Sequence, residues 1–256
     1  MYGVGNKAIG NIIHDCPHSA IMFHGNDMTI ADNEIYRVVM ETQDAGVIYA
    51  GRDYTWRGNV VSRNYIHHIG GKGMDDTNGI YNDDCISGTL MENNMFYKVK
   101  RAIFMGGGRD FVARGNVFIE CPVSIHVDTR GAVKDEGWSD MVNVTMRDRF
   151  YDIDGNGLSG IDPPYRDAYP ELKDIHEFYQ SGDKARILPS ALIEGNIICV
   201  SEKNGKIEYD AWGGVKKEQL AAEITEKDNV YIAKEQLKDY LTPEQFEKFK
   251  QTEDAD

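Results

Sequence analysis

Three aspartates are the residues of this chain whose type and surroundings best suit chemistry on a glycosidic bond. Asp44 stands just before a short strand-like run at residues 45–50, and Asp83 and Asp84 end a similar run at residues 79–84. Hydrolysis of a glycosidic bond usually needs two carboxyl groups, one that protonates the leaving oxygen and one that acts as nucleophile or base. Asp44 and Asp83 could form such a pair, provided that the fold brings these distant positions together.

The elements that must position these aspartates come from a repeat. An asparagine followed by apolar residues recurs along the chain, at Asn11, Asn33, Asn59, Asn64, Asn94, Asn116 and Asn196. Asn11 and Asn33 are 22 residues apart, and so are Asn94 and Asn116. The apolar runs between the asparagines are short and β-branched or alternating, which is typical of strands rather than helices.

Short strands at such a period predict an all-β solenoid, a parallel β-helix in which each repeat forms one coil and the coils bury a core by stacking. Asparagines at one turn can then form a ladder whose side-chain amides bond to the coils above and below. A β-sandwich with many asparagine turns would also explain the strands. It does not explain a second marker in phase with the first, the Gly-x-Asp turns at 25–27, 51–53 and 108–110.

Aligned strands of such coils place two columns of side chains on the outside of the solenoid. One column contains Met22, Tyr49, Tyr81, Phe104 and His126, and its neighbour contains His24, Gly51, Asp83, Gly106 and Asp128. We expect an exposed aromatic ladder beside carboxylates, where aromatic faces stack on sugar rings and glycines leave room for them. The alternative is that residues 131–190, which interrupt the repeat, cover this ladder as packing.

The spacing between coils limits which carboxylates can cooperate. Adjacent coils lie about 4.8 Å apart, so Asp44 and Asp83 would approach the roughly 5–5.5 Å carboxyl separation of retaining glycosidases. Asp83 and Asp128 would be two coils apart, about 9.6 Å, at the upper end of the inverting range. The substrate-binding residues that we expect around the pair are Tyr49, Arg52, Trp56, Tyr81, Arg109, His126 and Asp128. An aspartate can instead be a turn residue bonded to its own backbone, which is the interpretation we prefer for Asp53 and Asp110.

The remaining segments are expected to complete the solenoid. We predict coils over residues 1–200 with an irregular excursion at 131–190, followed at 201–256 by the last strand and a helical cap for the C-terminal end. Residues 242–245 have the N-cap, first-turn proline and capping-box partner of a helix. The first residues lack the charged and apolar regions of a signal peptide, so the localisation stays open. They also enter the repeat without a capping element, which favours a piece of a longer protein.

Composition argues against several classes of partner. The 256 residues include 28 Lys and Arg against 42 Asp and Glu, a net charge of −14, and no basic run occurs. Nucleic acid and anionic membrane surfaces are therefore poor partners. No stretch approaches the roughly 18 apolar residues of a membrane span, and the four cysteines are too widely spaced to indicate a zinc site. We expect no cofactor, with calcium as the one alternative.

Four strings resemble bacterial right-handed parallel β-helix proteins akin to glycoside hydrolase family 141: QDAGVIYAGRDYTWRGN at 43–59, GIYNDD at 79–84, GGGRD at 106–110 and HVDTRG at 126–131. The excursion, with PPY at 163–165 and YPEL at 169–172, resembles that of the same group, and the likeness covers roughly residues 5–200. The resemblance implies a carbohydrate-active enzyme working on plant cell-wall glycans, with α-L-fucosidase and xylanase activities in the family. It also implies a secreted, periplasmic or cell-surface location, several further coils and a cap before the first residue, and a catalytic pair of Asp44 with Asp83 or Asp84.

Two other functions remain as alternatives. A polysaccharide lyase would need a basic residue such as Lys100 or Arg101, and a cation such as calcium, which the Asp75-Asp76 and Asp83-Asp84 pairs could bind. The two outward columns contain no Lys or Arg, which weighs against this function. A non-catalytic glycan-binding or structural β-helix would show the same surface, and replacing the predicted catalytic aspartates with asparagine would then change nothing.

Overall fold

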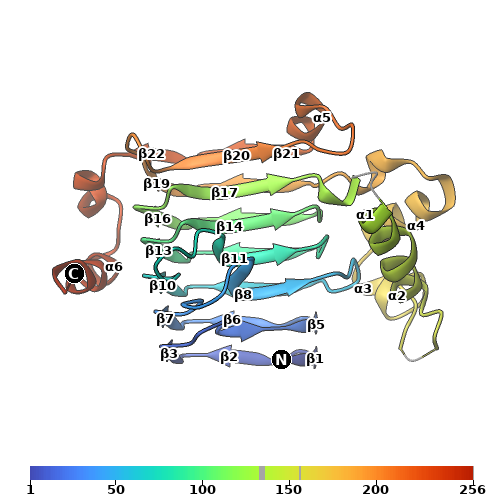
Figure 1. Ribbon diagram of the computed structural model, residues 1–256, viewed down its shortest axis with the longest axis horizontal. Helices are drawn as coiled ribbons and strands as arrows, with labels where there is room; N and C mark the ends of the chain where they lie inside the picture. The colour runs from blue at the N-terminus through green and yellow to red at the C-terminus, as the bar shows by residue number, and fades with distance from the viewer. Residues whose placement is uncertain (133–135, 156, 256) are drawn as a thin grey trace.

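The chain folds into a stack of parallel coils, with short helices at one end and on two sides (Figure 1). The computed structural model describes residues 1–132, 136–155 and 157–255. Three long parallel sheets run along the stack, and a two-stranded sheet of β1 (Tyr2–Val4) and β5 (His24–Asn26) adjoins them at the first coils. This stacking is that of a parallel β-solenoid, as the repeat predicts.

Each long sheet collects one strand from successive coils. The site sheet, named for the predicted aspartates, consists of β4 (Ile21–Met22), β8 (Ala45–Gly51), β11 (Thr77–Asp83), β14 (Arg101–Gly106), β17 (Val123–Asp128) and β20 (Lys206–Asp210). The outer sheet consists of β3 (Ile12–His14), β7 (Glu34–Tyr36), β10 (Tyr65–His67), β13 (Met95–Tyr97), β16 (Val117–Ile119), β19 (Ile197–Cys199) and β22 (Val230–Ile232). The third sheet consists of β2 (Lys7–Ile9), β6 (Thr29–Ala31), β9 (Asn59–Ser62), β12 (Thr89–Glu92), β15 (Phe111–Arg114), β18 (Ala191–Glu194) and β21 (Ile224–Lys227).

The register of the site sheet is the predicted one for the column of Met22, Tyr49, Tyr81, Phe104 and His126, whose members are paired in succession. In the neighbouring column, Gly51 pairs with Asp83, and Gly106 pairs with Asp128. In the first coil, His24 pairs instead with a residue of β1. The inward residues of the same strands, an isoleucine column with almost no exposed surface, form part of the core.

The asparagine ladder runs along the turn that precedes the outer sheet. The Nδ2 of Asn64 donates to the Oδ1 of Asn94 at 2.9 Å, and the Nδ2 of Asn94 donates to the Oδ1 of Asn116 at 3.0 Å. The members of the ladder are Asn11, Asn33, Asn64, Asn94, Asn116, Asn196 and Asn229. Asn59 does not belong to it, because its Oδ1 accepts a hydrogen bond from the backbone of Met28 at the start of another strand. Buried amides that bond in this way fix the vertical register of the coils.

The excursion forms a helical layer against one side of the stack (Figure 1). Its helical segments are η1 (Arg130–Ala132), α1 (Glu136–Asp140), the π-helix η2 (Met141–Met146), α2 (Arg147–Tyr151), α3 (Tyr165–Ala168), α4 (Leu172–Ser181) and η3 (Lys184–Ile187). Phe150, Ile175 and Phe178 of this layer pack on Tyr54 and Cys85 of the coils. The excursion is therefore a packed layer with its own apolar core, attached to the solenoid next to the site sheet.

The C-terminal segment differs in two ways from the prediction. It contributes a strand to each long sheet, β20, β21 and β22, where the sequence predicts one last strand. The helix at the end of the stack is α5 (Lys217–Ala222), which buries Leu220 in the main core. After η4 (Lys234–Asp239), the helix α6 (Pro243–Asp254) begins at the predicted N-cap Thr242 but packs beside the outer sheet through Phe249. Among the described residues, no helix combines the length and apolarity that crossing a bilayer requires.

Candidate functional site

A groove lies between the site sheet and the first helices of the excursion. Its larger part has a volume of ≈ 1270 Å³, and its lining includes Asp44, Asp83 and Asp84. Its smaller part, ≈ 860 Å³, is lined by Tyr49 and Trp56 and by residues of the first coil. The two parts share Arg52, Thr145 and Arg149, so they form one continuous groove along the solenoid.

The predicted catalytic aspartates are joined by a crossed pair of tyrosines. Tyr81, in the coil of Asp83, donates a hydrogen bond to the Oδ1 of Asp44 at 2.9 Å. Tyr49, in the coil of Asp44, donates a hydrogen bond to the Oδ2 of Asp83 at 2.9 Å. The two rings meet edge to face with their centroids 5.4 Å apart. Each tyrosine thus fixes the carboxylate of the neighbouring coil.

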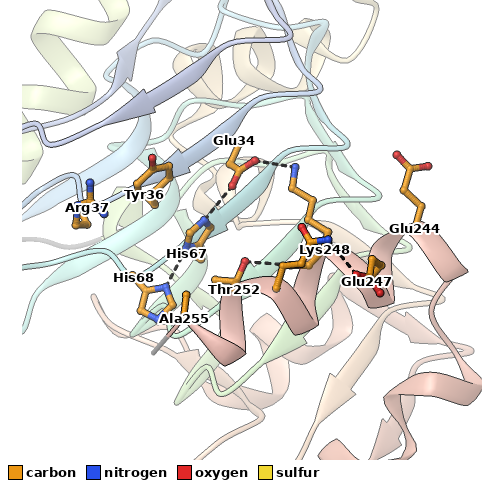
Figure 2. A pocket seen from close by; sticks show the side chains of 11 residues that line it. Glu34, Tyr36, Arg37, His67, His68, Glu244, Glu247, Lys248, Thr252 and Ala255 are labelled. Carbon is orange, nitrogen blue, oxygen red and sulfur yellow. Dashed lines mark hydrogen bonds and ion pairs between the residues drawn. The ribbon is translucent and has the colours of Figure 1, made fainter.

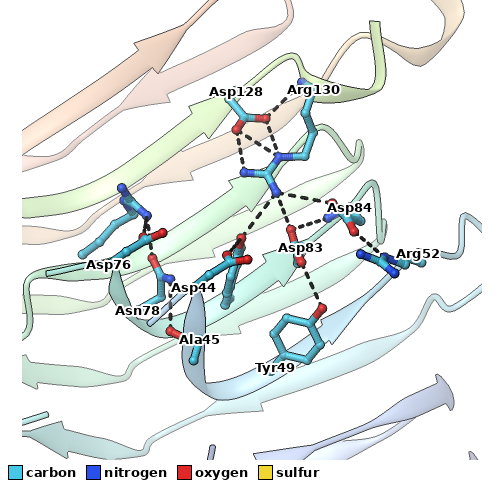
Figure 3. Close-up of polar contacts among 12 residues, drawn as sticks. Asp44, Ala45, Tyr49, Arg52, Asp76, Asn78, Asp83, Asp84, Asp128 and Arg130 are labelled. Carbon is cyan, nitrogen blue, oxygen red and sulfur yellow. Dashed lines mark hydrogen bonds and ion pairs between the residues drawn. The ribbon is translucent and has the colours of Figure 1, made fainter. Parts of the chain in front are cut away.

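Arg130, which follows the site-sheet strand β17, connects the two halves of this network (Figure 3). Its Nη1 contacts the Oδ1 of Asp83 and lies 3.4 Å from the hydroxyl oxygen of Tyr81. Its Nη2 and Nε bind both oxygens of Asp128 at 2.8 to 3.1 Å. The contacts therefore run in series from Asp83 through Arg130 and Tyr81 to Asp44. Three contacts of about 3 Å each limit the distance between Asp44 Oδ1 and Asp83 Oδ1 to about 9 Å.

The two carboxyl groups lie in different environments. Burial raises the pKa of Asp83 to about 6, and the charge of Asp84 adds to this, while Arg130 and Tyr49 oppose it. Asp44 is exposed at the edge of the groove. Burial also raises the pKa of both Tyr49 and Tyr81, which keeps the two hydroxyl groups protonated as donors. A carboxyl that can hold a proton near neutral pH beside an exposed carboxylate is the arrangement that acid–base chemistry requires.

Contrary to the expectation from the sequence, Gly51 and Gly106 of the outward column that contains Asp83 leave no room for a sugar. A Cβ atom on Gly106 would lie 2.9 Å from the guanidinium carbon of Arg130, and one on Gly51 would lie 3.1 Å from the Cβ of Asp83. The space above these glycines is filled by the site residues of the next coils. The glycines therefore allow the close approach of Arg130 and Asp83 to the sheet.

The expected exposed aromatic ladder is also corrected. Tyr81, Phe104 and His126 are only 3 to 5% exposed. Their rings stack face to face, with centroid distances of 5.0 Å for Tyr81–Phe104 and 4.5 Å for Phe104–His126. Rings that stack on one another at the coil spacing cover each other's faces, so these faces are not available to sugars. The exposed member of the column is Met22, at 41%.

His126 and Trp56 both line the groove, one in each part. His126 Nε2 lies 3.0 Å from Asp210 Oδ2, and burial lowers the pKa of His126. Trp56 is half-buried and packs against His24, with ring centroids 4.8 Å apart. Arg52 binds Asp84 at 2.5 Å on the wall between the two parts.

Two predicted binding residues lie away from the groove surface. Arg109 contacts Asp174 at 3.3 Å and the carbonyl of Arg186, so it attaches the excursion to the coils. Asp128 has no exposed surface and lies behind the guanidinium of Arg130. The preferred turn interpretation of Asp53 is confirmed, because its Oδ1 accepts hydrogen bonds from both the backbone and the hydroxyl of Thr55.

The residues considered for a lyase are bound to one another. Lys100 pairs with Asp75, and Arg101 pairs with Asp76 at 3.0 Å. These pairs occupy both the proposed bases and two of the proposed calcium ligands. Among the described residues, no group of three or more His, Cys, Asp or Glu side chains has an arrangement that could hold a metal ion.

The residue that sequence reasoning missed is Arg130. The two outward columns contain no basic residue, but the chain turns after Asp128 and returns the Arg130 side chain over the site sheet. Trp138 and Arg149 of the excursion, which also line the groove, were missed as well. One indication of Arg130 was present in the sequence, its position two residues after Asp128 of the outward column. There was none of Trp138 and Arg149, because their contacts depend on the fold of the excursion.

A separate cavity of ≈ 720 Å³ lies between the outer sheet and α6 (Figure 2). Glu34 lies 3.0 Å from the Nζ of Lys248 and 3.5 Å from the Nε2 of His67. Burial lowers the pKa of His67 to about 4, with a further contribution from His68. The charged groups here connect α6 to the sheet, and we assign this cavity to the attachment of the helix.

Comparison with known proteins provides no relative, since no family model, no curated protein and no solved structure matches this chain.

Proposed function

We propose that this chain is a glycoside hydrolase acting on a plant cell-wall type of polysaccharide, with an α-L-fucosidase-like or xylanase-like activity as the resemblance to glycoside hydrolase family 141 implies. The observation that carries the proposal is the network in which a buried Asp83, with a pKa raised to about 6, is linked to the exposed Asp44. The proposal includes a right-handed coil, because parallel crossover connections within one sheet are right-handed in about 98% of cases.

In this proposal, Asp83 is the general acid. Its proton passes to the glycosidic oxygen as the bond between that oxygen and the anomeric carbon breaks. On one route Asp44 attacks the anomeric carbon as that bond breaks, and water then hydrolyses the glycosyl ester while Asp83 takes the proton of the water; on the other route Asp44 takes a proton from the water that attacks the anomeric carbon directly. Tyr81 holds the carboxylate of Asp44 in place through its hydrogen bond.

Further side chains position Asp83 and the substrate. Arg130 and Tyr49 fix both oxygens of Asp83, so the carboxyl group cannot rotate away from the groove. Arg52 binds Asp84 and lies where the two parts of the groove meet, within reach of the hydroxyl groups of a bound sugar. Trp56 would contact a sugar unit in the smaller part of the groove, and the ring edge of His126, which is stacked on Phe104, would contact one in the larger part.

The first test is an activity screen of this chain on cell-wall polysaccharides, with new reducing ends and unsaturated uronates scored separately. We expect reducing ends without unsaturation, and a loss of about 10²–10⁴-fold in rate for Asp83→Asn. Asp44→Asn should be similarly impaired. Asp32→Asn, which removes an exposed carboxylate of a turn that pairs with Arg63, is the matched control and should keep full activity.

Unsaturated products would contradict hydrolysis and support a lyase. Full activity of both variants at the catalytic pair would show that a different pair of groups does the chemistry. Binding without any turnover would favour the non-catalytic glycan-binding solenoid.

A further inference from the structure

The charged side chains that line the larger part of the groove are mostly acidic. Seven aspartates line it: Asp44, Asp75, Asp76, Asp83, Asp84, Asp140 and Asp210. Four arginines line it: Arg52, Arg101, Arg130 and Arg149. His126 also lines it, and its pKa is lowered from 6.5 by burial, so it adds no charge at neutral pH. A ligand in the groove therefore meets an excess of negative charge.

The arginines are already bound to protein acceptors. Arg52 binds Asp84 at 2.5 Å, and Arg101 binds Asp76 at 3.0 Å. Arg130 binds the carboxylates of Asp83 and Asp128. Arg149 donates a hydrogen bond to the carbonyl of Arg52 at 2.7 Å. A carboxylate on a ligand would have to compete with protein carboxylates for three of these four cations.

The groove also offers aromatic surface. The chain contains 3 tryptophans, and Trp56, Trp138 and Trp212 all line the groove. Trp212 is 42% exposed, and it lies at the end of the groove opposite to Trp56. Aromatic side chains provide large apolar contact area without charge, which suits the apolar faces of sugar rings.

We propose that this groove binds an uncharged glycan chain and rejects polyuronates. The inference rests on the proposed function only in taking the ligand to be a glycan. Two like charges about 7 Å apart in a water-like dielectric repel enough to lower an affinity roughly threefold. Several such carboxylates within a Debye length of about 10 Å at 0.1 M salt act together on each uronate.

The experiment uses tryptophan fluorescence, because every tryptophan of the chain reports on the groove. The ligands are matched pairs: glucuronoxylan with its carboxyl-reduced form, and polygalacturonate with its highly methyl-esterified form. At low salt, we expect the neutral member of a pair to bind more tightly than the charged member. High salt should reduce the difference, since it screens the repulsion.

The double variant Asp140→Asn/Asp210→Asn removes an exposed carboxylate, Asp140, and a half-buried one, Asp210, from the groove wall. We expect it to raise the affinity for the charged polymer about tenfold at low salt and to change the affinity for the neutral form much less. Glu244→Gln/Glu247→Gln on α6 changes the net charge equally but far from the groove. It should have little effect on either ligand.

A charged polymer that binds as tightly as its neutral form at low salt would overturn the inference. So would an equal gain from the α6 variant, which would point to net charge rather than the groove. Selective binding of neutral chains without hydrolysis would uphold the inference and count against the proposed function. Failure of all four polymers to bind would overturn both.

Discussion

Replacing Tyr49 with phenylalanine removes one hydrogen bond from Asp83 and leaves the Arg130 contact in place. The Tyr49 hydroxyl donates to Asp83 Oδ2 at 2.9 Å, and this bond favours the charged carboxylate. Its loss must therefore raise the pKa of Asp83 above its value of about 6. If Asp83 is the general acid, the alkaline limb of the rate profile must move to higher pH by the same amount.

The size of this shift follows from the strength of the bond. A hydrogen bond to a charged group contributes about 1.5–3 kcal/mol, and one pKa unit corresponds to about 1.4 kcal/mol. Asp83 keeps two other donors, the guanidinium of Arg130 and the backbone N–H of Asp84. We therefore take the lower end of the range and expect the alkaline limb to move up by about one pH unit.

The assay is kcat/KM against pH on a polysaccharide that the chain cleaves. Tyr81→Phe is the matched control, because it removes the same hydroxyl from the other half of the crossed pair. Tyr81 donates to Asp44 and not to Asp83, so its loss should leave the alkaline limb nearly in place. The pKa of Asp83 can also be followed without turnover from the ¹³C signal of its carboxyl group, assigned with Asp83→Asn.

Three results would refute this reasoning. An alkaline limb that stays in place in Tyr49→Phe would show that Asp83 is not the acid. A shift to lower pH would show that Tyr49 stabilises the neutral carboxyl instead. Equal movement of one limb in both tyrosine variants would show that the two hydroxyl groups do not act on separate carboxyls.

Three further predictions concern stability and the glycine beside Arg130. Arg130→Met leaves buried carboxylates without their cation and should lower the free energy of unfolding by about 3–5 kcal/mol. Arg52→Met changes a side chain that is 62% exposed and should lower the free energy of unfolding by no more than about 1 kcal/mol. Urea denaturation measures both changes. Asn94→Ala removes a buried side chain that bonds to the coils on both sides and should lower the free energy of unfolding by about 3 kcal/mol. Asn11→Ala, at the exposed end of the ladder, should lower it by about 1 kcal/mol. Gly106→Ala brings a methyl group against the guanidinium of Arg130. It should lower the free energy of unfolding by about 1–3 kcal/mol and shift the pH profile of kcat/KM. An unchanged pH profile would contradict the role of the contact between Arg130 and Asp83.

The sequence allowed the coil, the register and the ladder to be predicted because each depends on a local pattern that recurs. Tyr81 and Phe104 fall into register because each directly follows the inward isoleucine of its strand, although the loops before the two strands differ in length. Asn64 and Asn94 stack because each directly precedes an apolar strand of the outer sheet. Asn59 shows the limit of this reasoning, since it has the same local pattern but begins a strand of the third sheet.

The exposure of the site was not predictable in the same way. Whether Phe104 faces sugar or protein depends on the rings above and below it and on the excursion, whose contacts no repeat encodes. The same holds for α6, whose N-cap was predicted correctly while its packing place was not, because capping is local and docking through Phe249 is not. Local rules gave the positions of the outward side chains, and non-local packing decided which of them reach solvent.

The construction of the site explains why a solenoid can hold a buried carboxyl next to an exposed one. Each coil contributes one carboxylate and one tyrosine, and the offset between Asp44, before its strand, and Asp83, at the end of its strand, lets each tyrosine reach the carboxylate of the other coil. Glycine at position 51 lets Asp83 lie close to the sheet, where burial raises its pKa. Asp44 has no such cover and stays exposed. The difference in exposure between the two carboxyl groups thus arises from their positions along equivalent strands. Arg130 is the charged residue in the series of contacts that links them.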